Sequence, residues 1–305
     1  GAVTLNSDLL AKQAGTNFTN SLLVGTSSTG TLSSAEGNTG VGVGVLGALT
    51  TGDNNVAVGF NSLDLNTTGS SNTSIGKDSL KSNTTGVGNT SVGMGTLYSN
   101  TTASYNTAIG SLALDTNTTG ASNTAVGYDA LTANSSGAGN VAIGVNSLDA
   151  NTTASNNTAV GLNSLTTNTT GADNTAVGRT SMEANTTGSN NVAVGLDSLA
   201  LNTTGASNVA VGYASLAANT TGNNNSALGK DALKLNTTAS SNTAVGNSVL
   251  TTNTTGASNT AVGAGAMFAN TEGACNTAVG VDALAANTTG ICNISVGSLS
   301  LAANT

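Results

Sequence analysis

The chain has 305 residues, of which 7% are charged and 2% are aromatic, and it contains no His, Trp or Pro. Without His there can be no Ser-His-Asp triad, no Cys-His dyad and no imidazole ligand for a metal. The formal net charge of −8 has the wrong sign for binding nucleic-acid phosphates, and no apolar run approaches the roughly 20 residues of a membrane-spanning helix. We therefore expect no cofactor, no nucleic-acid partner and no membrane insertion within this segment. So few aromatic rings also argue against the core of an ordinary globular domain.

Taken in chain order, the sequence consists of a short N-terminal segment, a weak repeat unit and a long regular array. Residues 1–20 lie outside any repeat and are predicted to form an N-terminal cap or linker. Residues 21–37 form a degenerate first coil, in which Val24-Gly25 is in phase with the units that follow. From residue 38 to residue 305 one pattern recurs every 17 residues without insertion or deletion, as fifteen full units and a sixteenth of thirteen residues. Equivalent slots that repeatedly hold the same residue type indicate equivalent environments, which is typical of stacked coils.

The repeat predicts one coil of a parallel β-solenoid for each unit. Its consensus is Asn-Thr-Ala-Val-Gly-x-x-Ser-Leu-x-x-Asn-Thr-Thr-Gly-x-x, and we number these positions 1 to 17. Seventeen residues are too few for two helices, and β-branched residues fill many of the apolar slots. We expect two short strands per coil, at positions 2–4 and 8–9, paired with neighbouring coils at about 4.8 Å. The Gly at position 5 predicts a positive φ or a close backbone approach, and positions 12–15 predict a second corner. The predicted fold class is therefore all-β, a solenoid of sixteen coils.

The predicted core consists of the large apolar residues that recur in every unit, at positions 4 and 9. Position 4 is Val or Ile in every unit but one, and position 9 is always Leu or Met, so stacking would produce two aliphatic ladders. This core includes Val58, Leu63, Ile75, Leu80, Val126, Leu131, Val160, Leu165, Val177 and Leu199. Position 3 admits only Ala, Ser or Gly, which predicts a close contact either with the other wall of the coil or with another chain. Two thin ladders are a small core for so long a chain, which favours a homo-oligomer.

The segment Asn-Thr-Ala-Val-Gly-x-x-Ser-Leu resembles the head repeats of YadA-like trimeric autotransporter adhesins. The longer pattern that ends in Asn-Thr-Thr-Gly is also similar to repeat arrays in tail-fibre-like proteins of phages and algal viruses. The resemblance spans residues 38–305 and implies a left-handed β-roll, three copies of which pack into a homotrimeric rod. The units here are longer than the usual head units of that family, and the additional residues fall in or near the Asn-Thr-Thr-Gly corner.

Two kinds of residue are candidate modification sites. Cys275 and Cys292 both occupy position 17, one unit apart, so a solenoid would stack them and could join them by an intrachain disulfide. Position 12 opens an Asn-x-Ser/Thr sequon in thirteen units. Such an Asn is either a glycosylation site in a eukaryotic secretory pathway or a corner residue with stacked amides; the candidates include Asn66, Asn83, Asn117 and Asn168. The acidic residues are scattered over variable positions and predict a solvated surface.

Together these features predict a non-catalytic extracellular fibre, such as an adhesin head, a surface filament or a viral tail-fibre shaft. It would lie on a cell or virion surface and act by rigid spacing and multivalent display. Its expected partners are copies of itself, with a trimer favoured by the resemblance, and a host-surface glycan or protein receptor. The alternative is an ice-binding solenoid that uses ranks of Thr and Asn. Thr at position 2 forms one such rank, which is interrupted at several units.

Overall fold

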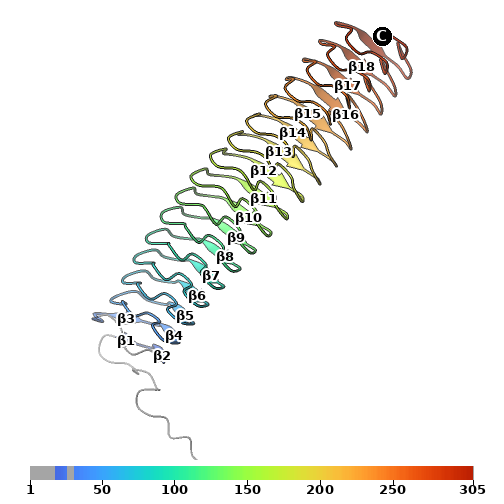
Figure 1. Cartoon of the computed structure of the whole chain (residues 1–305). Helices are drawn as coiled ribbons and strands as arrows, with labels where there is room; N and C mark the ends of the chain where they lie inside the picture. The colour runs from blue at the N-terminus through green and yellow to red at the C-terminus, as the bar shows by residue number, and fades with distance from the viewer. Residues whose placement is uncertain (1–17, 26–30, 305) are drawn as a thin grey trace, which may run out of the picture. The chain divides into compact units, whose positions relative to one another are not determined.

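The computed structural model describes residues 18–25 and 31–304, so most of the predicted N-terminal cap or linker lies outside the described residues. The chain divides into two compact units, Gly1–Ser155 (unit 1) and Asn156–Thr305 (unit 2). In the described residues every regular element is a β-strand (Figure 1). Unit 1 contains β1 (Phe18–Thr19), β2 (Leu22–Val24), β3 (Ala35–Glu36), β4 (Thr39–Val41), β5 (Val56–Val58), β6 (Thr73–Ile75), β7 (Thr90–Val92), β8 (Thr107–Ile109), β9 (Thr124–Val126) and β10 (Val141–Ile143). Unit 2 contains β11 (Thr158–Val160), β12 (Thr175–Val177), β13 (Val192–Val194), β14 (Val209–Val211), β15 (Ser226–Leu228), β16 (Thr243–Val245), β17 (Thr260–Val262), β18 (Thr277–Val279) and β19 (Ile294–Val296).

Within each unit the strands stack in parallel, one strand from each 17-residue coil. In unit 1, β2 pairs with β4, and β4 to β10 pair in succession. In unit 2, β11 to β19 pair in succession. The register joins equivalent positions, so that Thr175 lies opposite Val192 and Val177 opposite Val194. Both units are therefore parallel β-solenoids with the predicted 17-residue coil, and β2 brings the weak first repeat into the same stack.

Each coil has a single strand, at positions 2–4, and the second strand predicted at positions 8–9 is wrong. Positions 6–11 form turns, and the Leu at position 9 adopts a left-handed conformation, with φ of +55° at Leu165 and +51° at Leu199. A left-handed conformation costs an L-residue roughly 1–2 kcal/mol. Because the same Leu side chains are fully buried, and burial of a Leu contributes about 1.5–3 kcal/mol, the packing offsets the backbone cost.

Half of the predicted core is correct. Side chains alternate across a strand, and position 3, not position 4, points into the coil. The predicted core residues at position 9 have no solvent exposure, namely Leu63, Leu80, Leu131, Leu165 and Leu199. Those at position 4 face outward: Ile75 is 40% exposed, and the others are half-buried, namely Val58, Val126, Val160 and Val177.

The small residues at position 3 are explained by the opposite wall of the same solenoid. Ala159 and Ala176 are fully buried, and where Ser occupies these positions the two walls are joined by hydrogen bonds. Ser62 Oγ at position 8 donates to Ser74 Oγ at position 3 of the next coil over 2.8 Å. Position 3 is therefore restricted by the interior of one chain, and its composition is no argument for a second chain.

The Gly at position 5 has both features predicted for it, a positive φ and a close backbone approach. At Gly195 φ is +136°, and a Cβ added there would lie 2.6 Å from the backbone oxygen of Gly212 in the next coil. Neither the dihedral nor the space admits a side chain, which explains why every unit has Gly at this position.

Candidate functional site

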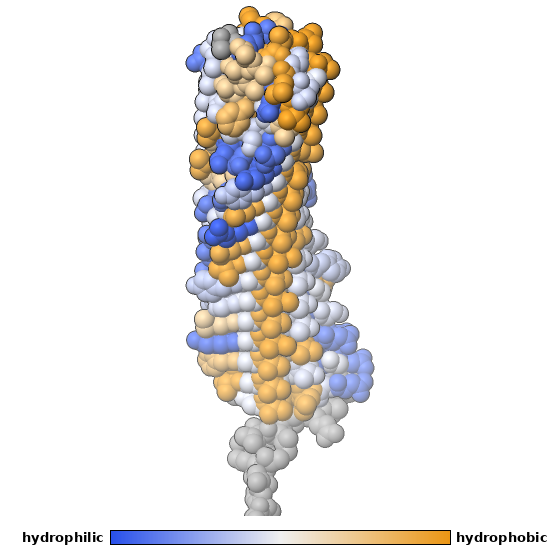
Figure 2. Space-filling model, turned by 90° about the vertical axis from the view of Figure 1, so that its right-hand side faces the viewer, coloured by the Kyte–Doolittle hydropathy of each residue, from blue (hydrophilic) through white to orange (hydrophobic). Residues whose placement is uncertain are grey.

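The outer surface of the strand stack carries apolar side chains outside the core. Positions 2 and 4 both project outward from each strand because position 3 points inward. Position 2 holds mostly Thr, whereas position 4 holds aliphatic residues, of which Ile109 and Val279 are 40% and 38% exposed. Figure 2 shows the apolar side chains of each unit gathered in a narrow band on this face, beside more polar ranks. We call the outward side chains of positions 2, 4 and 6 the sheet face.

Position 6 forms one margin of the sheet face and is often large and apolar. Phe60, Tyr128, Leu162, Tyr213 and Val281 occupy it and are each between 47% and 52% exposed. In three coils the same position holds a cation instead, at Lys77, Arg179 and Lys230. The sequence had indicated only that this position varies. Its location next to the position-4 ladder follows from the turn that begins directly after Gly at position 5.

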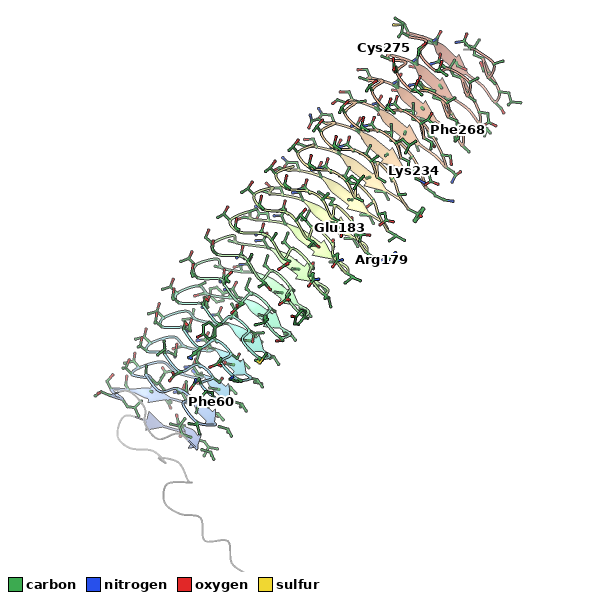
Figure 3. The ribbon with its side chains drawn as sticks, viewed as in Figure 1. Phe60, Arg179, Glu183, Lys234, Phe268 and Cys275 are labelled. Atoms are coloured by element: carbon green, nitrogen blue, oxygen red, sulfur yellow. The ribbon has the colours of Figure 1, made fainter. Side chains whose placement is uncertain are left out.

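Charged groups cluster beside the sheet face in two similar places, one in each unit. Lys81 Nζ lies 3.5 Å from Asp78 Oδ1 and 5.5 Å from the centre of the Tyr98 ring. In unit 2, Lys234 Nζ lies 3.0 Å from Asp231 Oδ1, and Figure 3 shows Lys234 on the same edge of that unit as Phe268. Both pairs are half-buried at the surface of the coil. Ion pairs near the surface contribute about 1 kcal/mol or less to stability, so these clusters affect the local charge of the edge more than the stability of the coil.

Three acidic groups at position 10 have raised pKa values for a common reason. Burial raises the pKa of Asp115 and of Asp149, and repulsion by Asp129 raises both further. Burial also raises the pKa of Asp64, where the positive charge of Lys81 acts in the opposite direction. In the described part of the chain, no three or more Cys, Asp or Glu side chains come together in a group that could hold a metal ion.

The four candidate glycosylation sites are buried, which contradicts their assignment as exposed acceptors. Asn66, Asn83, Asn117 and Asn168 have no solvent exposure. The amide of Asn83 donates to Asn66 Oδ1 over 2.8 Å and to the carbonyl of Gly86 over 3.0 Å. The alternative prediction, a corner with stacked Asn amides, is confirmed, because the corner turns its Asn inward and leaves the following Thr residues toward solvent.

A second ladder of Asn side chains, at position 1, donates hydrogen bonds to the same corner and so connects the start of each coil to its end. Asn72 Nδ2 donates to the carbonyl of Gly86 over 2.9 Å, so two Asn side chains of one coil, Asn72 and Asn83, share one acceptor. The backbone N–H of Asn72 also donates to Asn55 Oδ1 in the preceding coil over 3.0 Å. The interior of the solenoid therefore combines buried Leu side chains with hydrogen-bonded Asn amides. Near the C-terminal end of the position-12 ladder, Asn287 Oδ1 is buried without a hydrogen-bond partner among the described residues.

The two cysteines are separate and free in the structure, and both are exposed. Their stacking follows from the backbone, because Cys275 N and Cys292 N each donate over 3.0 Å to the residue at position 16 of the preceding coil, Ala257 and Ala274 respectively. The structure therefore places them in successive coils as predicted, and it contains no disulfide between them.

Residues 18–25 and 31–304 include no helix of the length and apolar character needed to cross a membrane. Comparison of the chain with family models, with curated proteins and with solved structures found no match.

Proposed function

We propose that this chain is a non-catalytic structural segment of an extracellular fibre, and that it assembles with copies of itself through the sheet face. The observation that carries the proposal is the outward-facing aliphatic ladder at position 4, where Ile75, Leu228 and Val262 are 36% to 42% exposed and other members, such as Val160 and Val177, are half-buried. Soluble monomers rarely leave contiguous apolar patches of more than a few hundred Å² uncovered. A ladder that is repeated on every strand of a stack is the kind of surface that association covers.

A second copy of the same chain is the occupant that fits this ladder. Both partners would carry side chains at the same spacing of about 4.8 Å, so each contact made by one coil recurs at the next. The Val and Ile side chains are stiff at χ1 and lose little freedom when they become buried. The family resemblance of the repeat supports three copies and a left-handed coil within this proposal.

Oligomeric state tests the proposal directly. The triple variant Val160→Lys, Val177→Lys and Val194→Lys places charges on the sheet face of three successive coils. It should lower the mass measured by light scattering to that of the 29.1 kDa chain, with an unchanged circular dichroism spectrum. The matched control Thr170→Lys, Thr187→Lys and Thr204→Lys adds the same charges to exposed position 14 of the same coils and should retain the oligomer. A monomeric wild type, or an oligomer unaffected by the sheet-face lysines, would refute the proposal.

Within such an assembly, the edges away from the sheet face would perform the adhesive role on a cell or virion surface. Positions 11, 16 and 17 vary from coil to coil, whereas the interior repeats. Weak contacts between these edges and a host glycan or protein would add through avidity. Binding to a glycan array should therefore weaken by at least about 100-fold when the sheet-face lysines dissociate the fibre, and equal binding by the monomer would contradict a multivalent mechanism.

Ice binding is the second candidate, and one observation favours it. Thr at position 2 and Val at position 4 project from the same side of each strand, so that Thr124 and Val126 lie side by side on a regular sheet. The sequence alone had indicated only an interrupted rank of Thr. Thermal hysteresis measured on wild type decides this: activity that disappears with the sheet-face lysines and persists in the position-14 control would support ice binding over self-association.

A further inference from the structure

We propose that Cys275 and Cys292 form a two-coordinate site for a thiophilic metal ion of the d¹⁰ type, such as Cu(I) or Ag(I). They are the two cysteines of the chain, both are exposed, and both lie in unit 2 at position 17 of successive coils. Their backbones adopt the same left-handed conformation, with φ of +59° and +57°. Because equivalent backbones direct their Cα–Cβ bonds in the same way, the two Cβ atoms project in parallel from the corner, and the two thiols do so when both side chains share one χ1 rotamer. Figure 3 shows Cys275 on the edge of unit 2 opposite Lys234 and Phe268.

The separation of the two cysteines is fixed on both sides by the stacked coils. Cys292 N donates to the carbonyl of Ala274, directly before Cys275, over 3.0 Å. The residue after Cys292 is also anchored, because Asn293 N and Asn293 Nδ2 donate to Asn276 Oδ1 over 2.8 and 3.0 Å. The backbones of the two cysteines therefore cannot approach each other without breaking the register between β18 and β19.

This separation suits a bridging ion better than it suits a disulfide. Neighbouring coils lie about 4.8 Å apart, and parallel side chains keep their sulfurs near that distance. A disulfide requires sulfurs about 2.05 Å apart and a C–S–S–C torsion near 90°. A linear S–metal–S bridge with bonds of about 2.3 Å, like those of Zn–S, requires sulfurs about 4.6 Å apart. The repeat of the solenoid provides that distance without distortion.

The donor set also selects the ion. Soft thiolates favour Cu(I), whereas Zn(II) takes four ligands in a structural site. The chain has no His, and the described residues contain no group of three or more Cys, Asp or Glu placed to complete such a set. Binding forms two sulfur–metal bonds and releases the two thiol protons to solvent, with no change in oxidation state.

The test uses the full chain with reduced thiols, titrated under anaerobic conditions with Cu(I) in competition with the chelator bicinchoninate. We expect one Cu(I) per chain, with X-ray absorption showing two sulfur neighbours, and no comparable binding of Zn(II). Cys275→Ser and Cys292→Ser should each abolish stoichiometric binding. Half-stoichiometric binding by either single variant would show bridging between chains and would overturn the proposal.

Two double variants, which change the number of coils between the cysteines, distinguish a bridging pair from two thiols that bind metal independently. Ser258 occupies position 17 one coil before Cys275, so Ser258→Cys with Cys292→Ser recreates a neighbouring pair and should restore binding. Ser258→Cys with Cys275→Ser leaves a pair two coils apart, about 9.6 Å at the β-strand spacing, and should not bind. Equal binding by both double variants would refute the proposal. Oxidised glutathione should form mixed disulfides with the wild type, and quantitative formation of an internal disulfide would refute the spacing argument.

Discussion

Removal of one amide from the position-12 ladder should destabilise the solenoid far more than its surface chemistry suggests. Asn202 Nδ2 donates to Asn185 Oδ1 over 2.7 Å and to the carbonyl of Gly205 over 2.9 Å, and Asn202 Oδ1 accepts from Asn219 Nδ2 over 2.8 Å. In Asn202→Ala, Asn185 Oδ1 loses its donor and one N–H of Asn219 loses its acceptor. Gly205 retains a bond from Asn191 over 2.9 Å.

Each buried polar group left without a partner costs about 1–3 kcal/mol, so the two together predict a loss of about 2–6 kcal/mol. The control is Thr204→Ala, two residues along the same coil, where the side chain is exposed and the expected change is within about 0.5 kcal/mol. Asn202→Leu should also destabilise, because it fills the space and still leaves both neighbours unpaired.

Native-state hydrogen exchange is the appropriate assay, because a repeat protein can open locally without unfolding as a whole. Protection should fall in the coils that contain Asn185, Asn202 and Asn219, and remain unchanged in distant coils of unit 2. If the exchange free energies of Asn202→Ala and Thr204→Ala agree within about 0.5 kcal/mol, the ladder does not stabilise the coil and the reasoning fails.

Three further predictions concern single sites. Leu199→Ala should cost about 2–5 kcal/mol in thermal unfolding, whereas Leu201→Ala, at a site that is 56% exposed, should cost less than about 0.5 kcal/mol; similar losses would contradict the assigned interior. Gly195→Ala should prevent soluble folding because of its φ of +136° and the adjacent backbone, whereas Gly139→Asn, at φ +67°, should fold, as judged by circular dichroism. Since burial raises the pKa of Asp149, the folded state holds that proton more tightly than the unfolded state, and stability falls as pH rises through the raised pKa. Asp149→Asn should therefore melt at a higher temperature than wild type near pH 7 and at the same temperature near pH 3, and a gain independent of pH would contradict the assigned cause.

The period, the parallel stacking and the fold class could be predicted from the sequence because they depend only on the recurrence of residues. The direction of each side chain was harder to predict. The recurrence of large apolar side chains predicted both Val177 and Leu199 as core residues, yet only Leu199 is buried. The alternation Thr-Ala-Val contained the necessary signal: when a strand faces a thin interior, the small residue Ala176 points inward and its larger neighbours point outward.

The conformation of the turns could not be predicted from residue preferences. Leu165 has a φ of +55°, a region that L-residues with large side chains seldom occupy. The tertiary structure imposes it, because the turn must bring that side chain into the interior of the coil. For Asn83 the sequence left two interpretations open, because Asn is common at exposed corners, and the repetition of the same amide at the same place supported the stacked interior that the structure shows.

The near-identity of successive interiors has a consequence for how such a chain can change in length. A stretch displaced by one whole repeat would meet the same Asn carbonyls, the same small residues and the same Leu side chains, so deletion or duplication of 17 residues leaves every ladder joined. Insertion of a single residue instead reverses which side chains face inward over the whole strand. Departures such as Leu49, which stands where other coils have Asn, are among the few internal markers that distinguish one coil from the next. Slippage by a whole number of repeats, during replication or during folding, would therefore leave the interior ladders intact. Slippage by any other number of residues would disrupt them.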